Sequence, residues 1–283
     1  MATQTPLVTP FFDAVTGTFT YVVADPATRV AAVIDPVLDY DPVTRRTSSE
    51  SAQQVLDHVQ QHALRVRWIL ETHAHADHLT AAQWLKQHFP QAIVGIGEEI
   101  RTVQASFKAS LSLEPDFATD GRQFDVLLKG GDRLALGNFQ VEVIDTPGHT
   151  PDSVTYIIGD AVFVGDTIFA PRFGTARCDF PGGDATTLWG SMQRLLALPD
   201  HMKIYLCHDY PPEAAQPQHL TDPASLREQN IHLKGGVTRE QFVQMREARD
   251  ATLKQPRLLE PSLRANIRAG ELSDSYFPGL GVG

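Results

Sequence analysis

Three histidines and an aspartate lie within six residues of one another, at His73, His75, Asp77 and His78. Imidazole nitrogens and carboxylate oxygens at such offsets are ligands for transition-metal ions. The group follows the apolar run 66–70, which is typical of a buried strand, and precedes a helix-like segment at 79–89. A motif of this kind should arise by chance in about one chain per thousand of this composition. The pattern therefore predicts a metal centre at the end of a strand.

Three further candidate ligands also stand directly after apolar, strand-like runs. His149 follows the run 139–144 through a Pro-Gly turn, Asp166 follows 161–164, and His208 follows 203–207. Strand ends gather along one edge of a sheet, where open α/β sheets bind their ligands. We therefore expect all seven side chains to meet at one edge. The other histidines lack this context and are expected to be solvated or locally bonded; they are His58, His62, His88, His201, His219 and His232.

Strand-like and helix-like segments alternate in a way that indicates two sheets. A hairpin is predicted at 19–24 and 29–35, a loop at 36–47, and a helix over 48–63 capped by Ser48 or Ser49. Further strands are expected at 92–96, 124–128, 132–136, 139–144, 154–158, 161–164 and 203–207. Helices are expected early in 98–119 and at 184–197, 222–230 and 238–253.

Helical segments on both sides of the strand-rich region predict an α+β fold, a four-layer αββα sandwich with its active site along one edge at the strand ends. We expect residues 1–255 to form the catalytic domain. The Pro- and Gly-rich residues 256–283 are expected to be a C-terminal extension packed on that domain.

The composition is that of an ordinary globular chain and disfavours several functions. The 283 residues are 42% hydrophobic and carry a net charge of −10, which argues against binding to nucleic acid or to an anionic membrane. No apolar run approaches the roughly 18 residues of a membrane span, and no secretory signal is visible. Two cysteines, Cys178 and Cys207, are too few for a disulfide framework, so a cytoplasmic protein is expected. A homodimer is compatible with the sequence.

The motifs at 72–78, 146–153, 165–166 and 207–210 together resemble the metallo-β-lactamase superfamily, over about residues 15–255. Within it, the segment 173–180 (FGTARCDF) and the sequence His208-Asp209-Tyr210 are similar to the glutathione-dependent persulfide dioxygenases, or sulfur dioxygenases. This resemblance implies oxidation of glutathione persulfide by O₂ to sulfite and glutathione, at one mononuclear non-haem Fe(II) ion per chain.

The resemblance also implies roles for particular residues. The two histidines and one carboxylate that hold iron in that family correspond to His73, His149 and Asp166 here. The other residues of the motifs would surround these ligands and orient them; they are His75, Asp77, His78 and His208. Tyr210 and His208 are expected to act in catalysis.

The same residues also suit a different reaction. A two-zinc hydrolase of glutathione thioesters, of the glyoxalase II type, would use one ion on His73, His75 and His149. The other ion would lie on Asp77, His78 and His208, with Asp166 bridging. Because both interpretations use one set of side chains, the sequence leaves the metal open. A non-catalytic zinc module is disfavoured, since structural sites usually close with four protein ligands.

Glutathione is a net anion, so its binding site needs cations. Arg177, on the loop after Asp166, is expected to hold a carboxylate of the substrate, with Tyr210 also in contact with it. Further candidate cations in the C-terminal helices are Lys234, Arg239 and Arg246. Cys178 is expected to be packed and inert, and strand alternation predicts that Cys207 points away from the metal.

Overall fold

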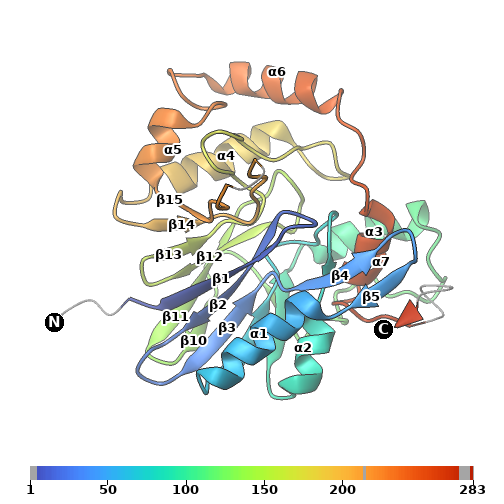
Figure 1. Ribbon diagram of the computed structural model, residues 1–283. Helices are drawn as coiled ribbons and strands as arrows, with labels where there is room; N and C mark the ends of the chain where they lie inside the picture. Colours follow the sequence, from blue (N-terminus) through green and yellow to red (C-terminus); the bar gives the residue numbers. More distant parts are fainter. Residues whose placement is uncertain (1–4, 213–214, 274–280, 283) are drawn as a thin grey trace.

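The computed structural model describes residues 5–212, 215–273 and 281–282. Two six-stranded sheets lie face to face in the middle of the molecule, and helices cover both outer surfaces (Figure 1). The predicted four-layer αββα sandwich, an α+β fold, is confirmed.

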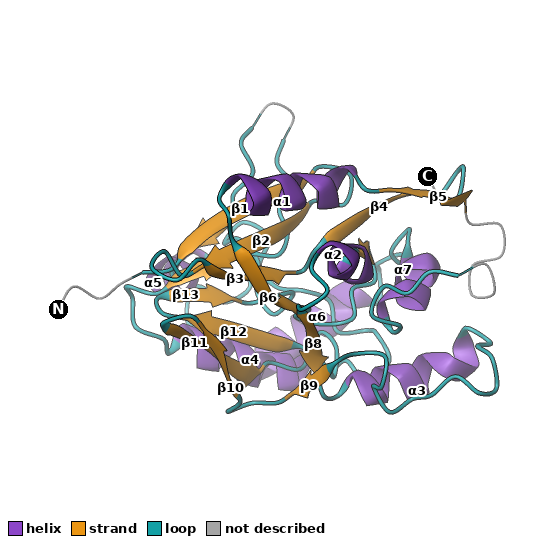
Figure 2. Ribbon diagram, turned by 90° about the horizontal axis from the view of Figure 1, so that it is seen from below, coloured by secondary structure: helices purple, strands orange, loops and turns teal. Residues whose placement is uncertain are grey.

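The first sheet has the strand order β1-β2-β3-β6-β8-β9. Strands β1 to β3 pair antiparallel, whereas β3, β6, β8 and β9 run parallel to one another. The strand bounds are β1 (Leu7–Asp13), β2 (Thr18–Ala24), β3 (Val30–Ile34), β6 (Arg65–Leu70), β8 (Ile93–Gly97) and β9 (Val126–Leu128). Helices α1 (Glu50–Gln61), α2 (Ala82–His88) and α3 (Ile100–Ser110) pack on its outer side, as the view from below shows (Figure 2). The parallel strands end at one edge, which places the residues after β6 there.

The second sheet has the order β10-β11-β12-β13-β14-β15. Its strands are β10 (Arg133–Leu136), β11 (Phe139–Asp145), β12 (Val154–Ile158), β13 (Ala161–Phe163), β14 (Lys203–Tyr205) and β15 (Leu220–Thr221). Helices α4 (Ala185–Leu196), α5 (Pro223–Gln229) and α6 (Arg239–Asp250) cover its outer face (Figure 1). Strand β13 pairs parallel with β14, so the segments that follow them begin at the same edge.

Alternation along the strands divides the core into layers. In β2, Val22 packs toward the helices, while its neighbours Tyr21 and Val23 pack between the sheets. In β13, Val162 faces α4 and Phe163 faces the first sheet. Successive side chains of a strand point to opposite faces, so apolar residues at both parities indicate strands covered on both sides.

The prediction of a loop at 36–47 is wrong. Residues 37–48 form a hairpin of β4 (Val37–Asp41) and β5 (Arg46–Ser48), which joins β7 (Leu79–Thr80) and β16 (Gly281–Val282) in a small third sheet. Proline and charged residues obscured the strands. Pro36 precedes β4, and Arg45 takes a positive φ of 56° at the turn.

Two helix starts also differ from prediction. Ser49 makes no capping bond, because the carboxylate of Asp39 accepts hydrogen bonds from Ser51 N and Oγ instead. Helix α2 begins at Ala82 rather than at 79, since the two residues of β7 pair with β4.

Helix α7 (Leu259–Asn266) has no counterpart among the predicted elements. Its Leu263 and the following Ile267 enter the core cluster beneath the first sheet, and Figure 2 shows the helix beside α2. Among the helices that the structure describes, none has the length and apolarity needed to cross a bilayer.

Candidate metal centre

His73, His149 and Asp166 meet at the edge of the sandwich. His73 lies just after β6, His149 after β11, and Asp166 after β13. Asp166 Oδ2 lies 4.0 Å from His73 Nε2 and 3.6 Å from His149 Nε2. One ligand atom from each of the three residues falls within 4.8 Å of the others, and all three side chains are buried. The arrangement offers two imidazoles and one carboxylate from one side, which is the pattern of a facial triad.

The outer ring nitrogens of the two histidines are bonded to protein. His73 Nδ1 lies 3.0 Å from Thr72 Oγ1, and His149 Nδ1 donates to the carbonyl oxygen of Arg177 at 2.7 Å. Such bonds fix the tautomer and the rotation of an imidazole. The Nε2 atoms are thereby left to face Asp166.

Close packing against α4 holds the turn that carries His149. Gly148 has a φ of +136°, and a Cβ there would lie 2.3 Å from Leu188 Cα. The Gly148 carbonyl oxygen accepts a hydrogen bond from Asp184 N at the start of α4. A residue with a side chain would have to displace either the helix or the turn.

A second group of donors adjoins the first through Asp166. His208 Nε2 lies 3.3 Å from Asp166 Oδ1 and 3.3 Å from Asp77 Oδ2, and His78 Nδ1 lies 3.4 Å from Asp77 Oδ1. Thus one carboxylate faces both groups, with Oδ2 toward His73 and His149 and Oδ1 toward His208. Beside the first set, the structure brings further sets of donor atoms within 4.8 Å of one another, among them His75 with Asp77 and His78, and His75 with Cys207 and His208.

Two carboxylates that are not among the predicted site residues lie beside His75. His75 Nε2 lies 3.0 Å from Asp35 Oδ1 and 3.7 Å from Glu71 Oε2. Asp35 directly follows β3 and Glu71 directly follows β6, so the rule applied to the other ligands would have singled them out. Burial raises the pKa of Asp35 to about 6, and burial with the nearby Asp35 raises that of Glu71 well above its usual range.

Several buried nitrogen and oxygen atoms that could bind a metal lack a hydrogen-bond partner among the described residues. They are His75 Nδ1, His78 Nε2, His208 Nε2 and Asp166 Oδ1. Buried polar atoms are normally bonded, so a cluster of exceptions on metal-binding side chains fits an ion. Burial lowers the pKa of His73 and of His75 well below the usual value, which keeps both imidazoles neutral and able to bind a metal. The chain therefore contains a metal-binding site, and its donor set fits one or two ions.

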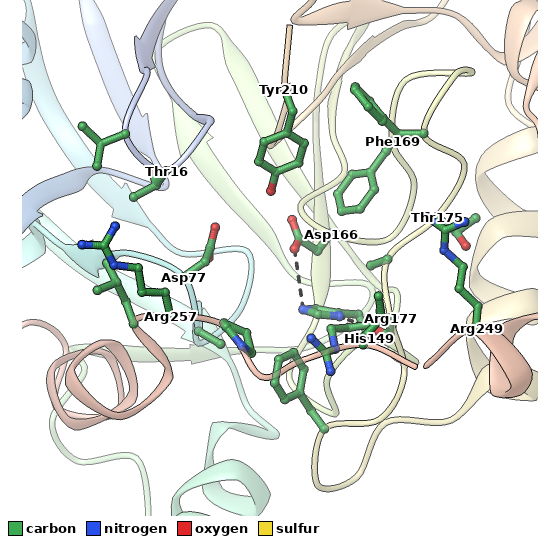
Figure 3. Close-up of a pocket in the computed structure, with 18 of the residues that line it drawn as sticks. Thr16, Asp77, His149, Asp166, Phe169, Thr175, Arg177, Tyr210, Arg249 and Arg257 are labelled. Carbon is green, nitrogen blue, oxygen red and sulfur yellow. Dashed lines mark hydrogen bonds and ion pairs between the residues drawn. The ribbon is translucent and has the colours of Figure 1, made fainter. Parts of the chain in front are cut away.

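A cavity of about 560 Å³ opens over this site (Figure 3). Asp77, His149 and Asp166 line its inner part, and an apolar wall of Phe169, Phe173, Phe180, Leu253 and Leu258 encloses them. A pocket of this size suits a small organic molecule whose reacting atom meets the metal.

Tyr210 stands over the centre with its hydroxyl pointing toward Asp166 (Figure 3). Its ring stacks on His208 with centroids 5.9 Å apart, and the residue remains 54% exposed. Burial of the hydroxyl and the charges of Asp77 and Asp166 raise its pKa above the usual value, so the hydroxyl stays protonated. Tyr210 can therefore donate a hydrogen bond into the cavity.

Arg177 also borders the cavity, but its fork is engaged. Nε and Nη2 bind the two oxygens of Asp179 at 2.5 and 2.6 Å, and Nη1 donates to the Lys254 carbonyl oxygen at 2.7 Å. A substrate carboxylate would have to compete with Asp179 for this guanidinium.

The cavity contains other arginines, in C-terminal segments where the sequence predicted a substrate contact only weakly or not at all. Arg246 is buried and binds Asp250 and the Thr175 carbonyl oxygen. Arg249 and Arg257 line opposite sides of the cavity (Figure 3) and are exposed, and neither guanidinium group makes a hydrogen bond or ion pair with another described residue. The candidates Lys234 and Arg239 do not line the cavity. Arg249 is three residues from Arg246 on one helix, which could have suggested it; Arg257 is placed by tertiary structure alone.

The two cysteines differ in surroundings, and both are free and buried. Burial raises the pKa of Cys178 to about 12, which agrees with an inert thiol. The prediction that Cys207 points away is wrong, because its Sγ lies among His75 and His208 and 3.8 Å from Asp35 Oδ2. Strand β14 ends at Tyr205, so alternation no longer applies at this position.

Comparison with known proteins agrees with this geometry. The family model described as Metallo-beta-lactamase superfamily matches residues 14–208. A Dictyostelium discoideum protein named Glyoxylase B2 is 49% identical over 252 residues, covering 89% of this chain and 86% of its own. The human protein named Persulfide dioxygenase ETHE1, mitochondrial, is 28% identical over 93% of this chain and 89% of its own. The crystal structure of ETHE1 from Myxococcus xanthus superposes with a TM-score of 0.74 at 31% identity, over 94% of this chain and all of that one.

Proposed function

The chain belongs to the metallo-β-lactamase superfamily, and on that premise we propose that it is a persulfide dioxygenase. The reaction takes glutathione persulfide, one O₂ and one water to glutathione and sulfite. The terminal sulfur is oxidised, O₂ is reduced, and the S–S bond breaks with a proton passing to the released thiol. A bound Fe(II) ion would supply the redox chemistry and the site for O₂.

The observation that supports this proposal most directly is the set formed by His73, His149 and Asp166. Its three donors face one point from one side, and the outer nitrogens of both histidines are already fixed by Thr72 and Arg177. Two imidazoles and one carboxylate leave open positions for a substrate sulfur and O₂. The likeness to proteins named ETHE1 extends over nearly the whole chain and agrees with this chemistry.

Side chains of the cavity account for the other requirements of the reaction. Tyr210 holds a protonated hydroxyl over the centre and can donate to a developing negative charge on sulfur or oxygen. His208 lies between Asp77 and Asp166, and these carboxylates raise its pKa although burial opposes them. His208 can thus hold the proton that the departing thiolate takes up. His208 and Asp166 are buried, so bulk water has little access to them.

We assign the carboxylates of glutathione to Arg249 and Arg257. Both guanidinium groups are free among the described residues and lie on opposite sides of the metal-facing part of the cavity (Figure 3). Glutathione carries a carboxylate at each end with the sulfur between them, so a persulfide aimed at the centre would direct its ends to opposite walls. Arg177 then acts mainly through its carbonyl bond to His149 and through Asp179.

The alternative is hydrolysis of glutathione thioesters by two zinc ions. The observation that favours it is the second donor group, in which His78 Nε2 and His208 Nε2 have no hydrogen-bond partner among the described residues. The name of the Dictyostelium relative points the same way. The substrate handle and cavity would be the same in both reactions.

One experiment separates the two. The protein is expressed in iron- and zinc-supplemented medium, its bound metal is measured, and O₂ uptake is followed with glutathione persulfide. We expect about one iron per chain, persulfide-dependent O₂ uptake and one sulfite per O₂. Two zinc ions, no O₂ uptake and rapid hydrolysis of S-lactoylglutathione would establish the hydrolase instead. We also propose a cytoplasmic location, since both cysteines are free thiols.

A further inference from the structure

The last residue of α7 reaches the metal-binding loop from far along the chain. Asn266 Nδ2 donates to the carbonyl oxygen of His75 at 2.7 Å and to that of His78 at 2.8 Å. Its Oδ1 accepts a hydrogen bond from Thr80 N at 2.8 Å. The side chain is buried, with 3% exposure. One amide group therefore uses both of its hydrogens and its oxygen on a single loop.

This loop has no sheet or helix to satisfy its backbone. The residues between β6 and β7 form bends and irregular backbone, and a buried carbonyl oxygen there needs a partner from elsewhere in the chain. The two carbonyls bound by Asn266 belong to His75 and His78, whose rings lie 4.2 Å apart. His75 Nδ1 and His78 Nε2 have no hydrogen-bond partner among the residues that the structure describes. Because each carbonyl lies in the peptide plane next to its Cα, holding the two carbonyls also restricts the directions in which the two side chains point.

The hydrogen bonds of Asn266 continue through Thr80 to one of the two carboxylates beside His75. Thr80, whose N–H Asn266 accepts, donates through Oγ1 to Glu71 Oε1 at 2.5 Å. Glu71 Oε2 in turn lies 3.7 Å from His75 Nε2. The C-terminal helix is thus connected to His75 by its backbone and, through Thr80 and Glu71, by its side chain.

We propose that Asn266 is a positioning residue of the metal centre. Through it, α7 fixes His75 and His78, which bind an ion where two are present and otherwise hold the ligand His73, whose ring lies 4.0 Å from that of His75. The proposal is independent of which reaction the centre performs. It makes the segment 256–273 part of the metal site although it contributes no ligand.

The test is binding of Co²⁺ alone to the metal-free protein, followed by visible absorption and by competition with a chelator. Asn266→Asp preserves the volume and the bond from Thr80 but sets an oxygen against the two carbonyls. Asn266→Ala removes all three bonds. Gln104→Ala is the matched control, because Gln104 is a buried amide that also makes three bonds, one of them to Ile267 O at the same end of α7, yet contacts no part of the motif.

We expect Asn266→Asp and Asn266→Ala to weaken Co²⁺ binding by about 10- to 100-fold and to alter the ligand-field spectrum. If two Co²⁺ ions bind, the loss should fall on the more weakly bound one. Gln104→Ala should stay within about threefold of the parent with an unchanged spectrum. Parent-like affinity and spectrum in Asn266→Asp, or an equal loss in Gln104→Ala, would overturn the proposal. Thermal unfolding of the metal-free proteins identifies any variant that does not fold, and Asn266→Asp, which leaves no cavity, then decides. If the parent protein does not oxidise persulfide but the Co²⁺ results are as expected, the proposed activity is wrong and the positioning role of Asn266 stands.

Discussion

Replacing Arg249 and Arg257 by glutamine tests whether the cavity recognises a molecule with two carboxylates. Each substitution removes one free guanidinium from one side of the cavity and leaves the metal-facing residues untouched. If the two arginines hold the two ends of glutathione, each variant should raise KM for glutathione persulfide with little change in kcat. The bond to the carboxylate is made equally in the ground state and in the transition state, so it contributes uniform binding.

The size of the effect follows from exposure. A hydrogen bond to a charged group contributes about 1.5–3 kcal/mol when sheltered. Both arginines are exposed, and solvent reduces such pairs to about 1 kcal/mol. About 1 kcal/mol corresponds to a roughly fivefold rise in KM for each variant. The two groups lie on opposite sides of the cavity, so their effects should add to roughly 25-fold in the double variant.

The assay is O₂ uptake with glutathione persulfide and, in parallel, with the persulfide of 2-mercaptoethanol, which has no carboxylate. The variants should differ from the parent with the first substrate and match it with the second. Lys234→Gln is the control, since it removes one exposed positive charge that lies outside the cavity. A KM that stays constant in the double variant, or one that rises equally for both persulfides or in Lys234→Gln, would refute the assignment.

Two further predictions concern buried groups near the centre. Burial raises the pKa of Asp152, which accepts a hydrogen bond from Ala74 N, to about 6. Its protonated form stabilises the metal-free fold below about pH 4, and this contribution is lost as pH rises through 6. Asp152→Asn should therefore add up to about 3 kcal/mol to the unfolding free energy of the metal-free protein at pH 7.5 and flatten its dependence between pH 4 and 6; urea titrations that show the same slope as the parent would contradict this. Cys178 should react with iodoacetamide at pH 8 far more slowly in the folded protein than after unfolding, and Cys178→Ser should keep persulfide-dependent O₂ uptake; a fast-labelling thiol would contradict its inert role.

The part of the site that the sequence predicts is the part set by strand ends. His73, His149, Asp166 and His208 each follow an apolar run, and the pairing of β13 with β14 and of β3 with β6 brings these ends to one edge. Periodicity and turn residues are local signals, so they suffice for this step. The same rule extends to Asp35, which directly follows β3 and bonds His75.

The part that could not be predicted depends on packing between distant segments. Asn266 bonds residues 186 to 191 positions away, and nothing in its own neighbourhood marks it. Arg257 reaches the cavity because the chain between α6 and α7 crosses its mouth, whereas Arg177, chosen from a motif, is held by a neighbouring aspartate two residues on. The hairpin at 37–48 was not predicted for another reason. Its proline and charged residues are typical of a loop, although Tyr40 pairs with Thr47 in a sheet.

Charge balance relates the two donor groups to the two reactions. An imidazole must be neutral to bind a metal, so with all of its histidines as ligands the centre carries only the two negative charges of Asp77 and Asp166, which one divalent ion neutralises. A second divalent ion leaves two positive charges in a buried site, which is costly unless anions offset them. A metal-bound hydroxide would supply one such anion. The nearest further carboxyl groups are those of Asp35 and Glu71, beside His75. Burial raises the pKa of both, so they hold their protons more tightly than ordinary carboxyl groups. The charge count thus favours a single ion on His73, His149 and Asp166, the occupancy that persulfide oxidation requires.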